Sequence, residues 1–280
     1  MSHSEPCGVY QCAQLWNATT GERLGAPLEH PGYVWAAVFS PDGQRVLIAG
    51  DGNSARLWDV KTRKPIGQPL LHNHRVRGVA FSPDGNTILT GGWDGEVRTW
   101  NAATAEPTGW SIKPGGNIYA VVFSPDGKSV LTDADFKARA WDVAGRKPIG
   151  PTFEHQNRVV ALAYTPDGQI VLTASLDKTA RFWSASTGKV LGPTLRHEKA
   201  IWSAVFTPDG KTALTGSADG TAQLWEVPIP LLGETAPILL WTQLITGMEL
   251  KADGSLEWLT SRTWHERRRS LLEQNGPPVP

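Results

Sequence analysis

The chain has 280 residues, and its 27 lysines and arginines balance its 27 aspartates and glutamates. This length allows one large all-β domain with a sizeable core, while the balanced charge disfavours nucleic acids and anionic membranes as partners. The only two cysteines, Cys7 and Cys12, exclude a disulfide scaffold and fit a reducing compartment. The sequence has no signal peptide and no apolar run of membrane-spanning length, so we expect a soluble cytoplasmic protein.

In chain order, residues 1–8 are expected to form an N-terminal tail and residues 9–237 a β domain. The first segment of this domain, Cys12 to Trp16, reads as a late strand of a repeated unit, with no P-D-G turn before it. We therefore expect the first unit to lack its two inner strands. The units that follow are Val34 to Leu70, Val76 to Ile112, Ile118 to Phe153, Val159 to Leu195, and Ile201 onward.

The units repeat with a period of about 42 residues, and two landmarks mark it. The aspartates of the P-D-G turns lie 42, 42, 41 and 42 residues apart, and they are Asp42, Asp84, Asp126, Asp167 and Asp209. The tryptophans that end a strand keep the same spacing, and they are Trp16, Trp58, Trp100, Trp141, Trp183 and Trp225. Because both landmarks stay in phase along the chain, the period indicates a repeated structure.

The unit is most complete between Ala200 and Glu226, where it predicts three short strands. The sequence T-P-D-G from Thr207 to Gly210 predicts a type I turn after the first strand, and Asp219-Gly220 predicts a turn before the third. A fourth strand leads into the next unit and contains prolines, which suit an outermost strand because proline cannot donate to a neighbouring strand. These prolines are Pro27, Pro69, Pro151 and Pro193.

About four strands in about 42 residues cannot bury both faces of a sheet alone, so the units must stack on one another. Residues 9–230 resemble the WD-repeat β-propeller family through the motifs L-W-D at Leu57 to Asp59, A-W-D at Ala140 to Asp142, and S-P-D-G at Ser40, Ser82 and Ser124. The resemblance implies an all-β fold, a β-propeller of four-stranded antiparallel blades, with five complete blades and one partial blade.

Prolines after Val227 mark a boundary, and a short, mainly helical C-terminal extension is expected over residues 238–275, with a flexible tail at 276–280. The elements expected there are a helix over Ile238 to Leu250, a strand over Ser255 to Leu259, and a helix capped by Ser261 that runs towards Gly276. This tail resembles the one that follows WD repeats in some bacterial proteins with an N-terminal serine/threonine kinase. That resemblance implies a detached sensory half, since the chain has no kinase motif.

The WD-repeat resemblance also implies a buried hydrogen-bond network of a histidine, a serine or threonine, an aspartate and a tryptophan. Two units match it, with His155, Ser175, Asp177 and Trp183, and with His197, Ser217, Asp219 and Trp225. A catalytic triad is disfavoured, because a serine sealed between strands has no open oxyanion hole. Other units lack a member, with Gly50 and Gly92 at the serine position and Pro114 at a histidine position, so we expect stability to fall towards the N-terminal half.

A further set of residues implies a binding surface, because the family places them at the mouth of a central channel. Seven positions before each P-D-G aspartate stand Trp35, Arg77, Tyr119, Val160 and Trp202. Four of these five are of residue types enriched at binding hot spots. Further candidates for the same rim are Tyr33, Arg75, Arg158 and Trp93. The alternative is that these aromatic rings pack between blades.

These features predict a non-catalytic scaffold that binds a protein or peptide at the channel mouth, in the setting of a serine/threonine kinase system. Two alternatives stay open, a propeller hydrolase acting at the channel mouth and a structural oligomer formed through the incomplete blade. The in-phase mouth positions hold no acidic residue or histidine for a hydrolase to use. We expect no cofactor and no metal, because His72 and His74 have no third in-phase ligand.

Overall fold

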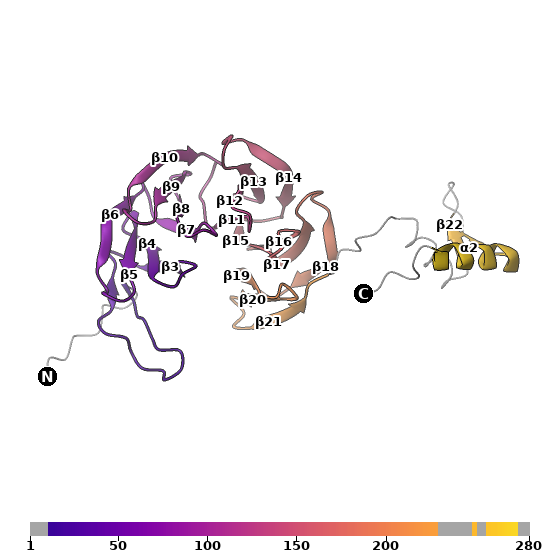
Figure 1. The fold of residues 1–280 in the computed structure, drawn as a ribbon, viewed down its shortest axis with the longest axis horizontal. Helices are drawn as coiled ribbons and strands as arrows, with labels where there is room; N and C mark the ends of the chain where they lie inside the picture. Colours follow the sequence, from indigo (N-terminus) through magenta and orange to yellow (C-terminus); the bar gives the residue numbers. More distant parts are fainter. Residues whose placement is uncertain (1–10, 229–247, 251–255, 274–280) are drawn as a thin grey trace. The chain divides into compact units, whose positions relative to one another are not determined.

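The computed structural model describes residues 11–228, 248–250 and 256–273 (Figure 1). The chain divides into two compact units, residues 1–228 and 229–280. In the first unit, the described strands form four antiparallel sheets of four strands, one sheet of three and one of two. The sheets follow one another around a common centre (Figure 1), which confirms the predicted β-propeller with four-stranded antiparallel blades.

We call these sheets the partial blade and blades 1 to 5, in chain order. The partial blade contains β1 (Cys12–Ala13) and β2 (Leu28–Glu29). Blade 1 contains β3 (Val34–Phe39), β4 (Arg45–Gly50), β5 (Ser54–Asp59) and β6 (Pro65–Leu71). Blade 2 contains β7 (Val76–Phe81), β8 (Thr87–Gly92), β9 (Val97–Asn101) and β10 (Pro107–Ile112).

Blade 3 contains β11 (Val121–Phe123), β12 (Ser129–Ala134), β13 (Lys137–Asp142) and β14 (Pro148–Glu154). Blade 4 contains β15 (Val159–Tyr164), β16 (Ile170–Ser175), β17 (Thr179–Ser184) and β18 (Val190–Arg196). Blade 5 contains β19 (Ile201–Phe206), β20 (Thr212–Ser217) and β21 (Ala222–Glu226). Blades 1 to 4 therefore have all four strands, and residues 229–247, which follow blade 5, lie outside the described residues.

The first turn of every blade closes in the same way. In blade 1, the amide of Gly43 donates to the carbonyl of Ser40 at 2.8 Å, which is the hydrogen bond of a β-turn. The Ser40 hydroxyl donates to Asp42 and accepts the amide of Arg45 at 3.0 Å. Equivalent contacts form at Ser82, Ser124, Thr165 and Thr207, so the turns predicted from the P-D-G motif are confirmed.

Each hydrophobic core lies between two successive blades. Leu47 and Leu57 of blade 1 pack with Val76 and Ile88 of blade 2, and all four side chains are fully buried. Ile48, the next residue after Leu47, belongs instead to the core between blade 1 and the partial blade. Because successive residues of a strand point to opposite faces of the sheet, every inner blade has two apolar faces and depends on both neighbours.

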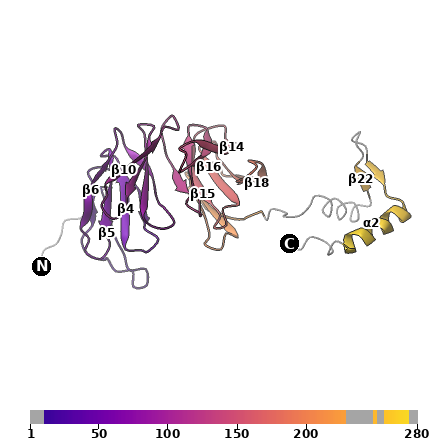
Figure 2. The same cartoon turned by 45° about the horizontal axis from the view of Figure 1, so that its top comes forward.

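The first strand of each blade lies towards the centre, and the fourth strand lies at the periphery (Figures 1 and 2). Contacts join the first strands of successive blades from β3 through β7, β11 and β15 to β19. Pro69, Pro151 and Pro193 lie in the outermost strands β6, β14 and β18. The assignment of these prolines to outermost strands is thereby confirmed.

The first and last blades each have an uncovered apolar surface. Phe39 on β3 is 56% exposed, because no inner strand of the partial blade is present among the described residues to cover it. Val205, Leu214 and Leu224 pair across the three strands of blade 5 and share one face. They are 53%, 39% and 69% exposed, whereas the residues at the positions of Leu214 and Leu224 in blade 4, Leu172 and Phe182, are buried against blade 5.

The second unit contains β22 (Met248–Leu250), which pairs with β23 (Leu256–Trp258), and α2 (Ser261–Glu273). The strand expected near residue 257 is confirmed by β23. The helix expected to end at residue 250 is wrong over its last three residues, which form β22. The rest of that expected helix lies outside the described residues, as do the tails expected at 1–8 and 276–280.

Thr260, and not Ser261 as expected, caps helix α2. The amide of Thr263 donates to the Thr260 hydroxyl at 3.2 Å, and the amide of Trp264 donates to the Thr260 carbonyl at 2.9 Å. A threonine hydroxyl in this position satisfies an amide that has no partner within the helix. The cap therefore lies one residue before the predicted one.

Two observations bear on the expected surroundings of the protein. Within the part of the chain that the structure describes, no helix has the length and apolar character needed to cross a membrane. Cys12 is disulfide-bonded. Because disulfides persist in oxidising surroundings, the cysteine content does not favour a reducing compartment, contrary to the expectation from the sequence.

Candidate functional site at the channel mouth

Four of the five in-phase mouth residues lie at an irregularity in the first strand of their blades. The register between the first and second strands shifts around Trp35, Arg77, Val160 and Trp202. A β-bulge of this kind leaves one residue outside the ladder and turns its side chain away from the regular alternation. At the start of the first strand, the bulges thus turn Trp35, Arg77 and Trp202 out of the interblade cores.

Arg77 brings the mouth residues of four blades together. Its guanidinium carbon lies 4.3 Å from the ring centroid of Trp35 in blade 1, 5.4 Å from that of Tyr119 in blade 3 and 5.8 Å from that of Trp202 in blade 5. All three distances are within the range of cation–π attraction. Val160 of blade 4 is 7% exposed and belongs to the buried core, so this position does not contribute to the group.

The other predicted rim residues attach to this centre through contacts of their own. Trp93 packs on Tyr119 with 5.3 Å between ring centroids, and Arg75 lies 4.5 Å from the centroid of Trp93. Arg158 donates to the Tyr119 hydroxyl at 2.8 Å. The rings of Tyr33 and Trp35 are 6.4 Å apart. The eight candidates form one connected group, here called the mouth cluster: Tyr33, Trp35, Arg75, Arg77, Trp93, Tyr119, Arg158 and Trp202.

Asp51 is the acidic residue that ties blade 1 into the mouth cluster. Its carboxylate accepts the indole N–H of Trp35 at 2.8 Å and pairs with Arg75 at 3.4 Å. The mouth cluster contains three arginines, so with Asp51 it carries a net positive charge. Burial is the main cause that lowers the pKa of Arg77 from its ordinary value, because removing water penalises the charged form.

Asp133 positions the backbone at Tyr119 through side-chain hydrogen bonds. In the other blades, pairing between the first and second strands holds this part of the backbone. Strand β11 begins only at Val121, and the Asp133 carboxylate accepts the amides of Tyr119 at 2.9 Å and Ala120 at 2.8 Å. Asp133 is fully buried, and burial raises the pKa of its carboxyl to about 8, although these amides act in the opposite direction. A buried acid thus holds the backbone beneath one wall of the mouth cluster.

Sequence reasoning missed both aspartates as parts of the site. The residues at the position of Asp133 in the other four blades are small, namely Ala49, Gly91, Ala174 and Gly216. When the repeats are aligned, an acidic residue at a position that is otherwise small and buried is the signal that identifies Asp133. No periodicity places Asp51 against Trp35, because this contact depends on the bulge at Trp35.

The buried network of blades 4 and 5 exists, but its hydroxyl comes from a threonine. His155 lies 2.9 Å from the Asp177 carboxylate and 2.6 Å from the Thr173 hydroxyl, which also accepts the indole N–H of Trp183 at 2.7 Å. Ser175, predicted in this role, instead donates to the carbonyl of Asn157 at 3.0 Å. The same holds in blade 5, where His197 contacts Asp219 and the hydroxyl of Thr215 lies between His197 and the indole of Trp225. The predicted Ser217 instead donates to a backbone carbonyl.

Strand geometry explains the correction. Trp183 pairs directly with Val171, so Thr173 lies two residues along the same face and Ser175 lies four. At about 3.3 Å per residue, four positions place Ser175 beyond reach of the indole. The oxygen of Thr173 accepts the indole N–H, and its hydroxyl proton is donated to Nε2 of His155. Nδ1 of His155 then carries the ring proton and donates it to Asp177. The network is therefore satisfied with a neutral imidazole.

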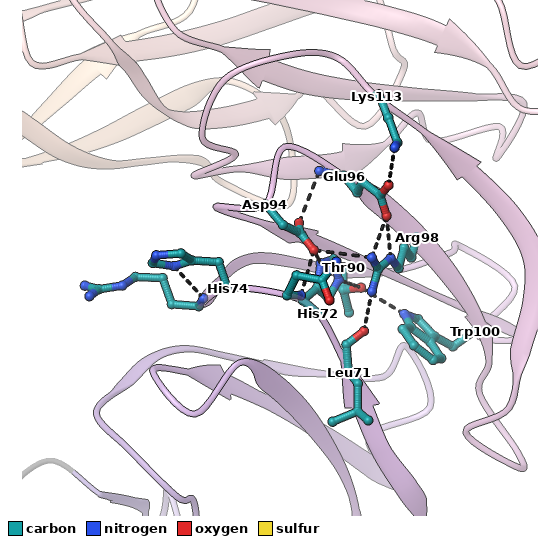
Figure 3. Close-up of polar contacts among 11 residues, drawn as sticks. Leu71, His72, His74, Thr90, Asp94, Glu96, Arg98, Trp100 and Lys113 are labelled. Carbon is teal, nitrogen blue, oxygen red and sulfur yellow. Dashed lines mark hydrogen bonds and ion pairs between the residues drawn. The ribbon is translucent and has the colours of Figure 1, made fainter.

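Blade 2 contains a full network as well, contrary to the expectation from Gly92. Figure 3 shows His72 between Asp94, at 3.0 Å, and Thr90, at 2.7 Å, with the indole of Trp100 donating to Thr90 at 2.8 Å. Burial lowers the pKa of His72, in agreement with a neutral ring. Arg98 adds an ion pair to Asp94 at 3.3 Å (Figure 3). Blade 2 is thus as well connected as blade 4.

Blades 1 and 3 lack part of the network. In blade 1, Ile48 occupies the threonine position, and the buried indole nitrogen of Trp58 has no hydrogen-bond partner among the described residues. In blade 3, Trp141 donates to Thr132 at 3.0 Å, but Pro114 replaces the histidine. The network is therefore incomplete where the threonine or the histidine is replaced. Replacement of the serine, as by Gly92 in blade 2, does not interrupt it.

The chemistry available at the mouth cluster is that of recognition. It combines aromatic rings with three guanidinium groups, and its nearest carboxylate, Asp51, is already paired with Arg75 and Trp35. Three or more histidine, cysteine or acidic residues do not converge as a metal-binding group anywhere in the described ranges. Aromatic and arginine side chains are the types that contribute most to protein interfaces.

Comparison with known proteins identifies the repeats. The family model of the WD domain, G-beta repeat (WD40), matches residues 22–59, 64–101, 111–142, 147–184 and 189–226. Each matched segment runs from the fourth strand of one blade through the third strand of the next, so the sequence repeat is offset from the blade by one strand. No curated protein matches the chain. The matched segments cover more than half of the sequence, and the chain belongs to the WD40 repeat family.

Proposed function

We propose that the protein is a non-catalytic scaffold that binds a protein or peptide segment at the mouth cluster. The observation that carries this proposal is the convergence of Trp35, Tyr119 and Trp202 from three blades on Arg77 of a fourth. WD40 propellers act in general as interaction scaffolds. A ring of sheets that gathers aromatic and cationic side chains at one opening supports the same role here.

The exposure of the rings supports binding over simple packing between blades. Trp35 and Trp202 are 45% and 46% exposed, and Tyr33 is 49% exposed. Tryptophans that only pack between blades are buried, as Trp100 and Trp183 are. Half-exposed rings held by a fixed guanidinium offer a large apolar area at little cost in side-chain entropy.

A pulldown with the purified chain tests this function. Trp35→Ala/Trp202→Ala should lose the bound partners that wild type recovers. The control Trp16→Ala removes a ring of similar exposure, 53%, from the end of the partial blade, and it should recover the partners unchanged. Equal recovery by wild type and the double variant would remove the mouth cluster as the binding site.

A serine/threonine kinase system is the setting that we propose for this scaffold, and the support is the resemblance of the C-terminal extension, residues 238–275, to the tail of kinase-linked bacterial WD-repeat proteins. We propose a cytoplasmic location from this setting alone, since the disulfide at Cys12 does not support it. Mass spectrometry of the proteins recovered by wild type, but not by Trp35→Ala/Trp202→Ala, checks this setting. The absence of any protein kinase from that set would contradict it.

A structural oligomer is a second candidate function, and the exposed face of blade 5 favours it. Val205, Leu214 and Leu224 form an apolar row that in blade 4 is covered by the next blade. A second copy of the chain offers an apolar surface of its own at Phe39, beside the partial blade. Packing of Phe39 against this row would bury both surfaces, since apolar surfaces of this kind mark interaction sites. The mass in solution tests it.

A further inference from the structure

The guanidinium of Arg77 differs from other blade arginines in its partners. Arg45 donates to the carbonyl of Ala102 at 2.8 Å, and Arg181 donates to that of Glu154 at 2.8 Å. Within the described ranges, Arg77 has no oxygen acceptor and no carboxylate at ion-pair distance, although the charge of Asp51 acts on it from farther away. Its contacts are the three aromatic rings. Its charge is therefore held in place without being paired.

The N–H groups of Arg77 remain available to a ligand. The buried side-chain nitrogens without a partner in the described part of the chain belong to Arg56, Trp58, Trp93 and Arg181, and none belongs to Arg77. The nitrogens of Arg77 are thus accessible at the mouth. Aromatic rings attract the charge but accept only weak hydrogen bonds, so the five N–H donors of the guanidinium have no strong acceptor.

The two neighbouring arginines are already engaged. Arg75 pairs with Asp51, and Arg158 donates to the Tyr119 hydroxyl. Their positive charge still favours an anion at the mouth, because among the described residues Asp51 is the acidic side chain that forms an ion pair with an arginine of the mouth cluster. One unpaired guanidinium suits one planar carboxylate, which accepts two parallel N–H groups. Phosphorylated residues, in contrast, are held by clusters of free arginines.

We propose that Arg77 binds a carboxylate of the peptide partner, while Trp35, Tyr119 and Trp202 enclose the apolar part of the same segment. The inference rests on the proposed function and specifies the chemistry of the partner. The carboxylate belongs either to an aspartate or glutamate side chain or to a free C-terminus. In both cases the rings fix the guanidinium before the ligand arrives, which lowers the cost of ordering it.

A random peptide library displayed with free C-termini supplies the probes, and selection uses the full chain. The dissociation constants of the selected peptides are then measured by calorimetry with wild type and with Trp35→Ala/Trp202→Ala. A peptide is assigned to the mouth cluster if its affinity for the double variant is at least about tenfold lower than its affinity for wild type. We expect them to share an acidic residue or to require their C-terminus.

Two changes to each mouth-binding peptide separate the sources of the carboxylate. Replacement of aspartate and glutamate by asparagine and glutamine should weaken binding by about tenfold to a hundredfold if a side chain is the ligand. Amidation of the C-terminus should do so if the terminal carboxylate is the ligand. Arg77→Lys keeps the charge but loses the planar pair of donors, and it should weaken the unmodified peptide while changing little for the neutralised one.

Arg196→Lys is the matched control, since this arginine is exposed on the outermost strand of blade 4, and it should leave all affinities unchanged. Thermal melting verifies that each variant is folded. Mouth-binding peptides that keep their affinity after both neutralisations would overturn the carboxylate proposal and leave the proposed function standing. A selection without binders, or binders that ignore Trp35→Ala/Trp202→Ala, would overturn both.

Discussion

The guanidinium of Arg77 in blade 2 lies over the ring of Trp202 in blade 5, 5.8 Å from its centroid, although blades 3 and 4 separate the two residues in the chain. Such a contact requires the first strands of the blades to surround one axis, which is how stacked repeats close around a centre. The geometry of the mouth cluster therefore depends on the stacking of every blade between these two residues.

Replacement of Thr173 by valine should lower the free energy of unfolding by about 1–3 kcal/mol, because His155 and the indole of Trp183 both lose a buried partner. Chemical denaturation measures this loss. Ser175→Ala is the control and should cost clearly less, since the Ser175 hydroxyl contacts only backbone groups. A larger loss for Ser175→Ala than for Thr173→Val would restore the serine to the network.

Two tryptophans at equivalent positions should respond differently to the same change. Trp183→Phe should be more destabilising than Trp58→Phe by about 1–2 kcal/mol, since only Trp183 donates a hydrogen bond that phenylalanine cannot replace. Both rings are buried to a similar degree, so the packing losses should be similar. Chemical denaturation of both variants and of wild type measures the two losses in the free energy of unfolding, provided that the denaturant dependence is the same for all three. Equal losses would contradict the unpaired state of the Trp58 indole.

The fold followed from the sequence because its signals are local and repeated. The turn at Asp42 closes through contacts within six residues, and the strand-ending Trp58 keeps the same place in its blade as Trp100 does. In-phase counting also selected the rim candidates, and the structure connects them in one group. That they bind a partner remains a prediction.

The predictions were wrong where the distance between side chains in the folded protein determines which residues form a hydrogen bond. Ser175 and Thr173 both face the tryptophan side of β16, and only the pairing register shows which one reaches Trp183. For the same reason, Thr90 completes a network that Gly92 was expected to break. Asp133 replaces a strand ladder by two hydrogen bonds to backbone amides, and no periodic pattern predicts an exception of that kind.

Asp133 should make stability depend on pH in the neutral range. Its pKa is raised from an ordinary value of 3.8 to about 8, so between these values the folded state holds a proton that the unfolded state has released. The stability that protonated Asp133 contributes is then fully present below about pH 4 and declines as pH rises towards 8. Denaturation of wild type and Asp133→Asn across this range should show the decline in wild type alone.

Glu154→Gln is the control for this experiment, because Glu154 is exposed on the outermost strand of the same blade and is not among the groups that shift the pKa of Asp133, and it should keep the wild-type decline. The network aspartates act at the other end of the scale. Burial alone would raise the pKa of Asp177, but hydrogen bonds from His155 and Thr179 hold it below its ordinary value. The stability it contributes is lost only as pH falls below about 4. A decline that persists unchanged in Asp133→Asn would contradict a buried neutral acid.

The apolar row on blade 5 should control association if copies of the chain pack on one another. Leu224→Lys places a charge on the row and should convert an oligomer to a monomer in light scattering, without lowering the melting temperature of the monomer. Lys211→Glu, on the turn of the same blade, changes charge outside the row and should leave the mass unchanged. A wild-type chain that is monomeric at every concentration would exclude the structural oligomer.

The most direct test of the mouth cluster is photo-crosslinking from defined positions of the intact protein. A benzophenone amino acid replaces Trp35, Trp202 or, as the control, Trp16, and the captured proteins are identified by mass spectrometry. We predict that positions 35 and 202 capture the same partner and that position 16 does not. Capture of that partner from position 16 alone, with none from 35 or 202, would contradict binding at the channel mouth.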